Sequence, residues 1–266
     1  MSQLGQESFP SAGNTKRFKI TWSEFVQHVL VLTIKAYQAM YQDQIAQSNW
    51  EENTFTIRLG EDYLRPIAFN NEYSVRVEIR TKVHTQQMRE GKQATIEAKE
   101  MDLSLYGIWE QDYHKIRFVW EAKRVGDKRV NDKYRKLNYE YIHGGIYRFI
   151  RREYADCLSD AGMLGYVLAG SVANIVGDIN LSMGRIRKNP PLSESNHLRL
   201  AQPIDNCQVP LLNHRFRGNS SPPDSKNQKG TPCQKTVENV YRSHHTRTDD
   251  TKICIHHLFL KFEFNF

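Results

Sequence analysis

The segment 102–123 constrains the fold of this chain more than any other. Two runs of apolar, aromatic and β-branched residues, 103–109 and 116–120, flank a short polar connector. Strand-forming runs on either side of a polar turn predict a β-hairpin. We expect Asp102 to open the first strand and Glu121 to close the second. Antiparallel pairing would then bring these two carboxylates to the same end of the hairpin.

The end of this hairpin opposite the turn carries charged side chains that alternate along the strand. Side chains alternate across a strand, so Glu121 and Lys123 should point to one face and Ala122 to the other. With Asp102 they would place two carboxylates and one ammonium at one end of a sheet. Carboxylate oxygens bind hard divalent cations, and a nearby ammonium supplies a base or a positive charge. This combination suits hydrolysis of a phosphodiester.

The order of the other expected elements favours an α/β fold. Thr21 and Glu24 form a capping-box pattern, and apolar residues then recur at helical spacing to about residue 48. Strand–helix–strand–helix order after the hairpin implies a mixed central sheet flanked by helices. The remaining expected elements are a helix over 48–68 unless Pro66 ends it early, a strand over 73–83, a basic helix around 142–152, a buried strand over 165–170, a helix from 171 to about 186, and closing strands over 237–246 and 252–262.

Composition divides the chain into four parts. Residues 1–20 are polar and predict a loose leader, and 21–187 hold the expected core. Seven of the nine prolines fall in 188–234, which predicts a long loop or insertion. Residues 235–266 predict a C-terminal β-hairpin that completes the same domain.

Positive charge is concentrated beside the candidate site. The whole chain has a net charge of +7, whereas 115–152 alone holds twelve Lys/Arg against four Asp/Glu, a local +8. Such a block favours a polyanionic partner, although taken alone it also fits a solvated helix face. Gly144 and Gly145 interrupt its helix, which a close approach to a neighbouring backbone or a helix start there would explain. The residues expected to contact nucleic-acid phosphates are Lys128, Arg129, Lys133, Arg135, Lys136, Arg148, Arg151 and Arg152.

The cysteines favour a reducing compartment. Four cysteines are scattered without a Cys-x-x-Cys pair, no signal-peptide pattern precedes residue 20, and no apolar run is long enough to span a bilayer. We therefore expect a cytoplasmic protein that is not embedded in a membrane. A zinc site built from Cys254, His256, His257 and either His244 or His245 is conceivable, but its spacing matches no zinc-ligand pattern and we do not predict it.

An acidic residue on a helix, then Asp102, then Glu121-Ala122-Lys123 across a hairpin, resembles the PD-(D/E)xK nuclease superfamily. The resemblance covers about 51–123, and Met101 stands where the family name has proline. It implies a restriction-endonuclease-like core in which Asp102 and Glu121 bind Mg²⁺, with Mn²⁺ able to substitute. It also implies that Ala122 lends its carbonyl to the metal and that Lys123 is the catalytic lysine, acting as a base or as a charge stabiliser.

The resemblance also implies a glutamate from the first core helix. Glu52 is in phase with the apolar stripe Phe55, Leu59 and Tyr63, whereas Glu51 falls on the more polar side. Helical periodicity therefore favours Glu52 as the fourth catalytic residue and metal ligand. A second Glu-x-Lys at 97–99 fits less well, because a polar stretch precedes it and no strand with an upstream aspartate accompanies it.

These observations predict a metal-dependent endonuclease that hydrolyses DNA, with restriction or antiphage defence as a setting suggested by analogy. One alternative is a nucleic-acid-binding protein with a degenerate nuclease core. Another is a subunit of a larger defence complex, with the proline-rich segment as a docking element. A homodimer would allow both strands to be cut, and the sequence leaves open the number of metals and the choice of DNA over RNA.

Overall fold

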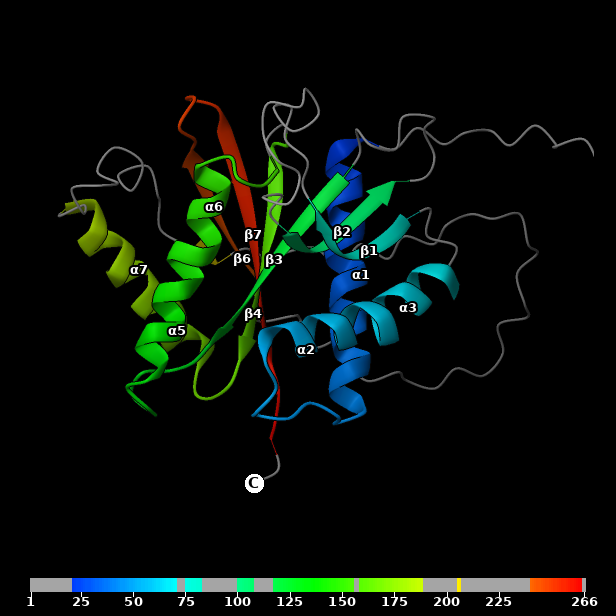
Figure 1. The fold of residues 1–266 in the computed structure, drawn as a ribbon, viewed down its shortest axis with the longest axis horizontal. Helices are drawn as coiled ribbons and strands as arrows, with labels where there is room; N and C mark the ends of the chain where they lie inside the picture. The colour runs from blue at the N-terminus through cyan, green and yellow to red at the C-terminus, as the bar shows by residue number, and fades with distance from the viewer. Residues whose placement is uncertain are drawn as a thin grey trace, which may run out of the picture.

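A computed structural model describes residues 21–70, 75–82, 100–107, 117–155, 158–188, 205–206 and 240–264. Its centre is a mixed open sheet with strand order β1-β2-β3-β4-β7-β6-β5 (Figure 1). The central strands β3, β4 and β7 run parallel, and the neighbours on either side pair antiparallel. The strands are β1 (Val75–Lys82), β2 (Glu100–Gly107), β3 (Arg117–Val125), β4 (Asp160–Val167), the two-residue β5 (Asp205–Asn206), β6 (Val240–Thr246) and β7 (Lys252–Lys261).

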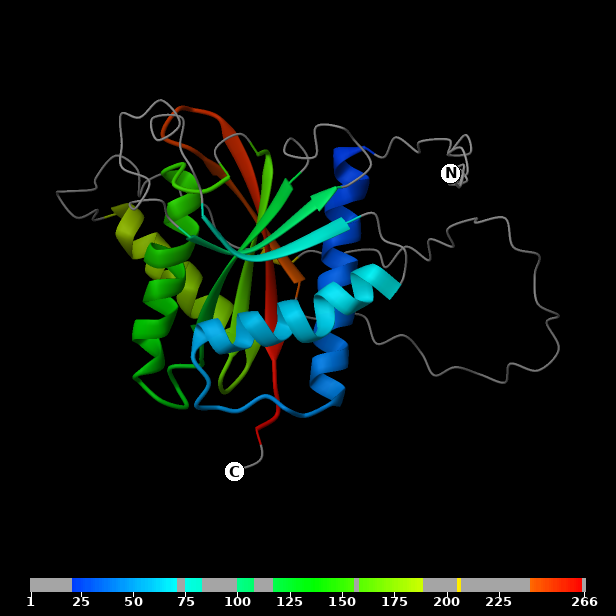
Figure 2. The ribbon, with the colours of Figure 1, turned by 45° about the vertical axis from the view of Figure 1, so that its right-hand side comes forward.

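Helices cover both faces of this sheet (Figure 2). One face packs against α1 (Trp22–Gln42) and the continuous run α2 (Glu52–Ile57), η1 (Arg58–Leu64) and α3 (Arg65–Asn70). The other packs against the run α5 (Tyr134–Tyr141), η4 (Ile142–Ile146) and α6 (Tyr147–Ile150), and against α7 (Val172–Lys188). Each face buries its own apolar cluster, as expected of a sheet with parallel strands linked by helical crossovers. The expected α/β fold with a mixed sheet between helices is confirmed.

The first two helices differ from expectation at their ends. The capping box of Thr21 and Glu24 is present, but α1 ends at Gln42 instead of near residue 48. Gln44 adopts a left-handed backbone conformation (φ 50°), which no helix can continue through. The second helix starts at Glu52 rather than at Ser48.

Pro66 does not end that second helix. The preceding turns, Arg58–Leu64, widen into a π-helix, and the N–H of Arg65 bonds to the carbonyl of Gly60 five residues earlier. The backbone hydrogen bonds have therefore already changed from the α-helical to the π-helical pattern just before Pro66, which has no N–H to donate. The chain continues as a helix to Asn70.

The predicted hairpin exists as β2 paired antiparallel with β3. Its strands are longer than expected at the site: β2 starts at Glu100, ahead of Asp102, and β3 runs past Glu121 to Val125. The last residues of β3 are held in place by β4, because the parallel pairing between the two strands continues as far as Val125. The connector between the two strands lies outside the described residues.

The strand expected over 165–170 begins earlier, at Asp160, and ends at Val167. Its missed first half contains Gly162, which pairs with Trp120 of β3. A Cβ at Gly162 would lie 2.1 Å from the Trp120 ring, so the absent side chain makes room for that ring. The C-terminal hairpin is confirmed as β6 and β7, and β7 joins the sheet beside β4.

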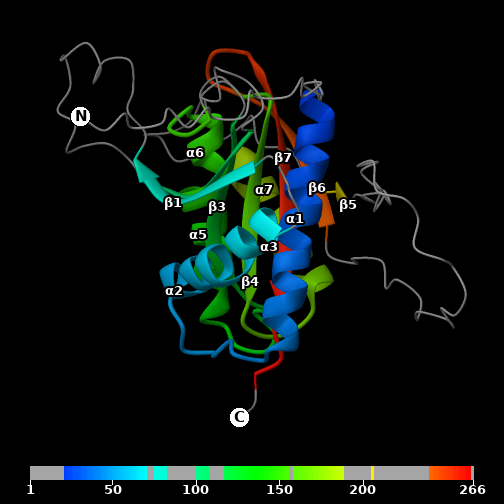
Figure 3. The ribbon, with the colours of Figure 1, turned by 90° about the vertical axis from the view of Figure 1, so that its right-hand side faces the viewer.

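Several expectations lie outside the described residues, namely the leader 1–20, nearly all of the proline-rich segment and the second Glu-x-Lys at 97–99. In the described ranges, no helix combines the length and apolar character needed to cross a bilayer. Figure 3 shows α1 lying along the sheet, close to β7 and β6.

Candidate active site

The candidate site lies where β2 separates from β3. The pairing between these strands ends at Leu103 opposite Trp120. Beyond it, the N–H of Ala122 donates to Asp102 Oδ2 over 2.7 Å, and the N–H of Arg124 donates to the carboxylate of Glu52. Side-chain carboxylates thus replace the missing strand partner on this edge of β3. Backbone donors require such partners when they are shielded from water.

The other neighbour of β2 is interrupted at the same level. Strand β1 pairs through Ile79 with Leu103 and through Thr81 with Met101, but Arg80 between them has a left-handed backbone (φ 54°). That conformation is costly for a residue other than glycine and breaks a regular ladder. Asp102 therefore sits where pairing is disturbed on both sides of its strand, and its side chain turns to β3.

Lys123 is the centre of the site. Its Nζ lies 2.8 Å from Glu52 Oε1, 2.8 Å from Glu121 Oε1 and 2.6 Å from the carbonyl oxygen of Ala122. The predicted alternation of Glu121, Ala122 and Lys123 is present, and the side chain of Lys123 is 12% exposed. The ammonium therefore joins a helix start and a strand that are far apart in the sequence. Of the two candidate glutamates, the structure brings Glu52 into the site, whereas Glu51 is exposed and precedes the helix.

Glu121 is the most deeply buried carboxylate of the site. Its side chain is 1% exposed, its Oε1 accepts from Lys123 and from Arg148 Nη1 (2.9 Å), and its Oε2 has no hydrogen-bond partner. Burial, reinforced by the nearby charge of Asp102, raises the pKa of Glu121 to about 8 despite the opposing charges of Lys123 and Arg148. A buried oxygen without a partner is unfavourable unless a cation or a proton satisfies it.

The other two titrating groups respond to the same environment. Burial raises the pKa of Glu52, and the charge of Lys123 only partly offsets this. Burial lowers the pKa of Lys123, but the charges of Glu121, Glu52 and Asp102 outweigh it and the net pKa is raised. Lys123 is therefore protonated at neutral pH. Around it, three carboxylates face the positive charges of Lys123 and Arg148.

Helical glycines form the wall over Lys123. A Cβ at Gly144 would lie 3.3 Å from Lys123 Cε, and one at Gly145 would lie 2.3 Å from Met163 Cε. The close approach expected at these glycines exists, but the neighbours are side chains of the sheet and not another backbone. The absence of two methyl groups allows the π-helical turn η4 to lie directly on β3.

The donor set fits a hard divalent cation. Oxygens from three carboxylates and the Ala122 carbonyl converge on one region, and Glu121 Oε2 is buried without a partner. Mg²⁺ prefers such oxygen ligands. However, Glu52, Asp102 and Glu121 do not bring three carboxylate oxygens within 4.8 Å of one another. The Lys123 ammonium stands between Glu52 and Glu121 in the place of a cation, so metal binding requires this ammonium to move aside.

The expected phosphate-contacting residues divide into two groups. Six of the eight form ion pairs with carboxylates of the protein itself, and one of these, Arg148, does so inside the site with Glu121. Lys133 and Lys136 instead line a cavity of about 400 Å³ together with Arg124. The other five pairs are Lys128 with Asp178, Arg129 with Asp127, Arg135 with Asp132, Arg151 with Glu153, and Arg152 with Asp249.

Sequence reasoning missed Tyr154. Its hydroxyl accepts a 2.6 Å hydrogen bond from Arg148 and donates to the carbonyl of Glu100 at the start of β2. This chain of contacts fixes Arg148 against Glu121. Tyr154 stands at no characteristic spacing from Asp102, Glu121 or Lys123 in the sequence. Its place in the site depends on how the segment after α6 packs against β2.

Comparisons of the chain with protein-family models, with curated proteins and with solved structures found no match.

Proposed function

We propose that the protein is a metal-dependent endonuclease that hydrolyses phosphodiester bonds of DNA, with a catalytic centre of the PD-(D/E)xK type. One observation carries the proposal. Glu52, Asp102 and Glu121, from three separate elements, converge where β2 leaves β3, with Lys123 among them. Glu121 Oε2 is buried without a hydrogen-bond partner, which is unusual for an ordinary carboxylate at the end of a strand and more typical of a functional site. A mixed sheet flanked by helices is compatible with a restriction-endonuclease-like core.

Asp102, Glu121, Glu52 and the carbonyl of Ala122 are the proposed ligands of Mg²⁺ or Mn²⁺. When bound, such an ion lowers the pKa of water and screens negative charge on phosphate oxygens. The raised pKa of Lys123 favours a charge-stabilising role for this residue over that of a general base. Displaced from its two glutamates, its ammonium would lie beside the phosphate that reacts. Arg148, held by Tyr154, keeps Glu121 in place.

The cavity beside β3 is the proposed grip on the DNA backbone. Lys133, Lys136 and Arg124 supply positive charge around about 400 Å³, and Ser48 closes it from the connection between α1 and α2. The Arg124 side chain leaves β3 on the face opposite to Lys123 and donates to the carbonyl of Trp50, two residues before Glu52, so the cavity lies near the start of α2. Phosphate contacts of this kind position nucleic acid without reading its sequence.

A second candidate function is DNA binding without cleavage. The observation in its favour is that Lys123 and Arg148 already offset much of the carboxylate charge. In that case the two cations would be structural partners and no divalent ion would enter. A nuclease requires Mg²⁺ to compete successfully with the Lys123 ammonium.

Plasmid cleavage separates the two functions. Supercoiled plasmid is incubated with the protein in Mg²⁺, Mn²⁺ or EDTA, beside Asp102→Ala, Lys123→Ala and Lys188→Ala. Lys188 is an exposed lysine at the end of α7 and controls for loss of one positive charge. We expect metal-dependent cleavage by the wild type and by Lys188→Ala, and no cleavage by Asp102→Ala or Lys123→Ala. Cleavage that persists in Asp102→Ala and Lys123→Ala would overturn the site, and DNA binding without any cleavage would favour the second candidate.

A further inference from the structure

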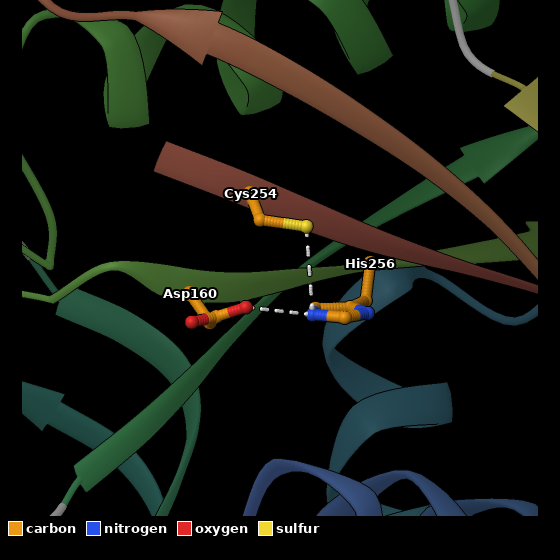
Figure 4. A group of neighbouring side chains, drawn as sticks. All are labelled: Asp160, Cys254 and His256. Atoms are coloured by element: carbon orange, nitrogen blue, oxygen red, sulfur yellow. Dashed lines mark hydrogen bonds and ion pairs between the residues drawn. The ribbon is translucent and has the colours of Figure 1, made fainter. Parts of the chain in front are cut away.

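A second cluster of metal-ligating side chains lies away from the candidate active site, at the starts of β4 and β7. Asp160, Cys254 and His256 bring a carboxylate oxygen, a sulfur and a ring nitrogen within 4.8 Å of one another (Figure 4). Among the described residues it is the only such trio of His, Cys, Asp or Glu. Parallel strand register creates it, because Asp160 pairs with Cys254, and His256 follows two residues later on the same face.

The arrangement is unsuited to a nucleophilic triad. In such a triad the nucleophile and the acid contact opposite nitrogens of the histidine ring. Here Cys254 Sγ lies 3.7 Å and Asp160 Oδ1 lies 3.0 Å from the same atom, His256 Nε2. One ring nitrogen cannot serve both partners as a donor at once. Three ligand atoms facing a common point is instead the arrangement of a metal centre.

The distances fit a tetrahedral ion. Zinc bonds of about 2.3 Å to sulfur and 2.0 Å to nitrogen or oxygen place neighbouring ligand atoms about 3.3–3.5 Å apart. The separations of 3.7 Å and 3.0 Å bracket this range, and the third pair, Cys254 Sγ and the Asp160 carboxylate, lies within 4.8 Å. Thiolate and imidazole ligands favour Zn²⁺ over Mg²⁺. The mixed donor set therefore differs in kind from the all-oxygen set around Lys123.

Contacts outside the trio orient the carboxylate. Asp160 Oδ2 accepts a 2.6 Å hydrogen bond from Trp22 Nε1 and a 2.8 Å hydrogen bond from Ser159 Oγ. These bonds direct Oδ1 to His256, as partners of metal ligands commonly do. His256 is 9% exposed and its ring lies 6.1 Å from that of Phe118, so the histidine is shielded from water, whereas Asp160 and Cys254 are partly exposed.

We propose that Asp160, Cys254 and His256 bind a Zn²⁺ ion that joins β4 to β7 and, through Trp22, fixes the start of α1 on the sheet. Three protein ligands leave the fourth position for water. This corrects the zinc site considered from the sequence, because His257 lies on the opposite face of β7. There His257 bonds to Tyr141 and Ser243, and Ser243 in turn bonds to His245. The missing ligand was Asp160, which no local spacing connects to Cys254.

Cobalt substitution tests the site. The full-length protein, stripped of metal with a chelator, is titrated with Co²⁺, and thiolate-to-cobalt charge-transfer absorption is recorded before Zn²⁺ is added in competition. We expect one equivalent with a thiolate band that Zn²⁺ removes. Cys254→Ser should abolish the band, and Trp22→Phe should weaken zinc binding about tenfold or more. Cys233→Ser, in the proline-rich segment, is the matched control and should behave as the wild type.

The outcomes keep this site separate from the nuclease site. Asp102→Ala should keep the thiolate band whether or not the protein cleaves DNA. Circular dichroism checks the fold of each variant, and Asp160→Asn, which retains an oxygen for Trp22, serves as a second ligand variant with reduced zinc affinity. Absence of a thiolate band in the wild type, or its persistence in Cys254→Ser, would overturn the proposal.

Discussion

Lys123 Nζ lies 2.8 Å from Glu121 Oε1, and the Glu121 side chain is 1% exposed. This ion pair is buried beneath the helical turn that carries Gly144. Its two charges depend on each other, because neither is well solvated by water. The pair therefore joins the proposed catalytic lysine to a proposed metal ligand, and it also contributes to the stability of the fold.

Replacing Lys123 with methionine should destabilise the protein. Removing one partner of a buried pair leaves the other without compensation, which costs about 3 kcal/mol in the free energy of unfolding. Urea unfolding at pH 9 measures this cost, because Glu121, with a pKa of about 8, is mostly ionised there. The double variant Lys123→Met/Glu121→Gln should recover most of the stability but no cleavage. A double variant as unstable as the single one would show that the unpaired charge is not the cause.

Stability without metal should fall as pH rises. Burial raises the pKa of Glu121 from 4.5 to about 8, so between these values the folded state holds a proton that the unfolded state has released. The free energy of unfolding therefore decreases as pH rises from about 4.5 to about 8. Thermal unfolding in EDTA at pH 5, 6, 7 and 8 measures the trend. Glu121→Gln should flatten it over this window, and an equal slope in that variant would assign the trend to other groups.

Two glycine substitutions should act in opposite directions. Gly162→Ala should destabilise the protein by about 1–3 kcal/mol, because its Cβ would lie 2.1 Å from the rigid Trp120 ring. Gly177→Ala, in α7 with no atom within 4 Å of the added Cβ, should stabilise it by about 1 kcal/mol. Urea unfolding of both variants provides the comparison. An unchanged free energy of unfolding for Gly162→Ala would contradict the close contact between Gly162 of β4 and the Trp120 ring of β3.

DNA affinity should depend on the lysines of the cavity more than on the paired arginines. Lys133→Ala and Lys136→Ala should each weaken binding and reduce the salt dependence by about one unit of slope. Arg152→Ala should have a smaller effect, because Arg152 already pairs with Asp249. Fluorescence anisotropy of labelled duplex at several salt concentrations measures both quantities. A larger loss in Arg152→Ala would move the DNA path to the far end of α6.

The sequence was sufficient where the signal is local. Two apolar runs on either side of a polar connector predicted the β2–β3 hairpin, and strand spacing placed Glu121 and Lys123 on one face. Helical periodicity favoured Glu52 over Glu51, and the structure brings Glu52 to Lys123. Each of these inferences needs only the period of a helix or a strand and the pairing of neighbours in the chain.

Long-range packing decided what the sequence could not predict. Arg148 was expected to face DNA, but the packing of α6 over the sheet directs it to Glu121. The expected strand over 165–170 omitted the first half of β4, where Gly162 makes room for a ring from β3. Asp160 joins Cys254 only through the parallel pairing of β4 with β7. Sequence period carries no information about such contacts.

The most direct test of the proposed active site compares two adjacent glutamates. Glu51 is exposed ahead of α2, whereas Glu52 contacts Lys123, so Glu51→Gln and Glu52→Gln remove the same charge one residue apart. The measurement is the rate of Mg²⁺-dependent cleavage of supercoiled plasmid at saturating protein. We expect a wild-type rate for Glu51→Gln and a rate at least about 100-fold lower for Glu52→Gln, which corresponds to a loss of about 2.7 kcal/mol of transition-state stabilisation. Equal rates for the two variants, or no cleavage by the wild type, would argue against the proposed active site.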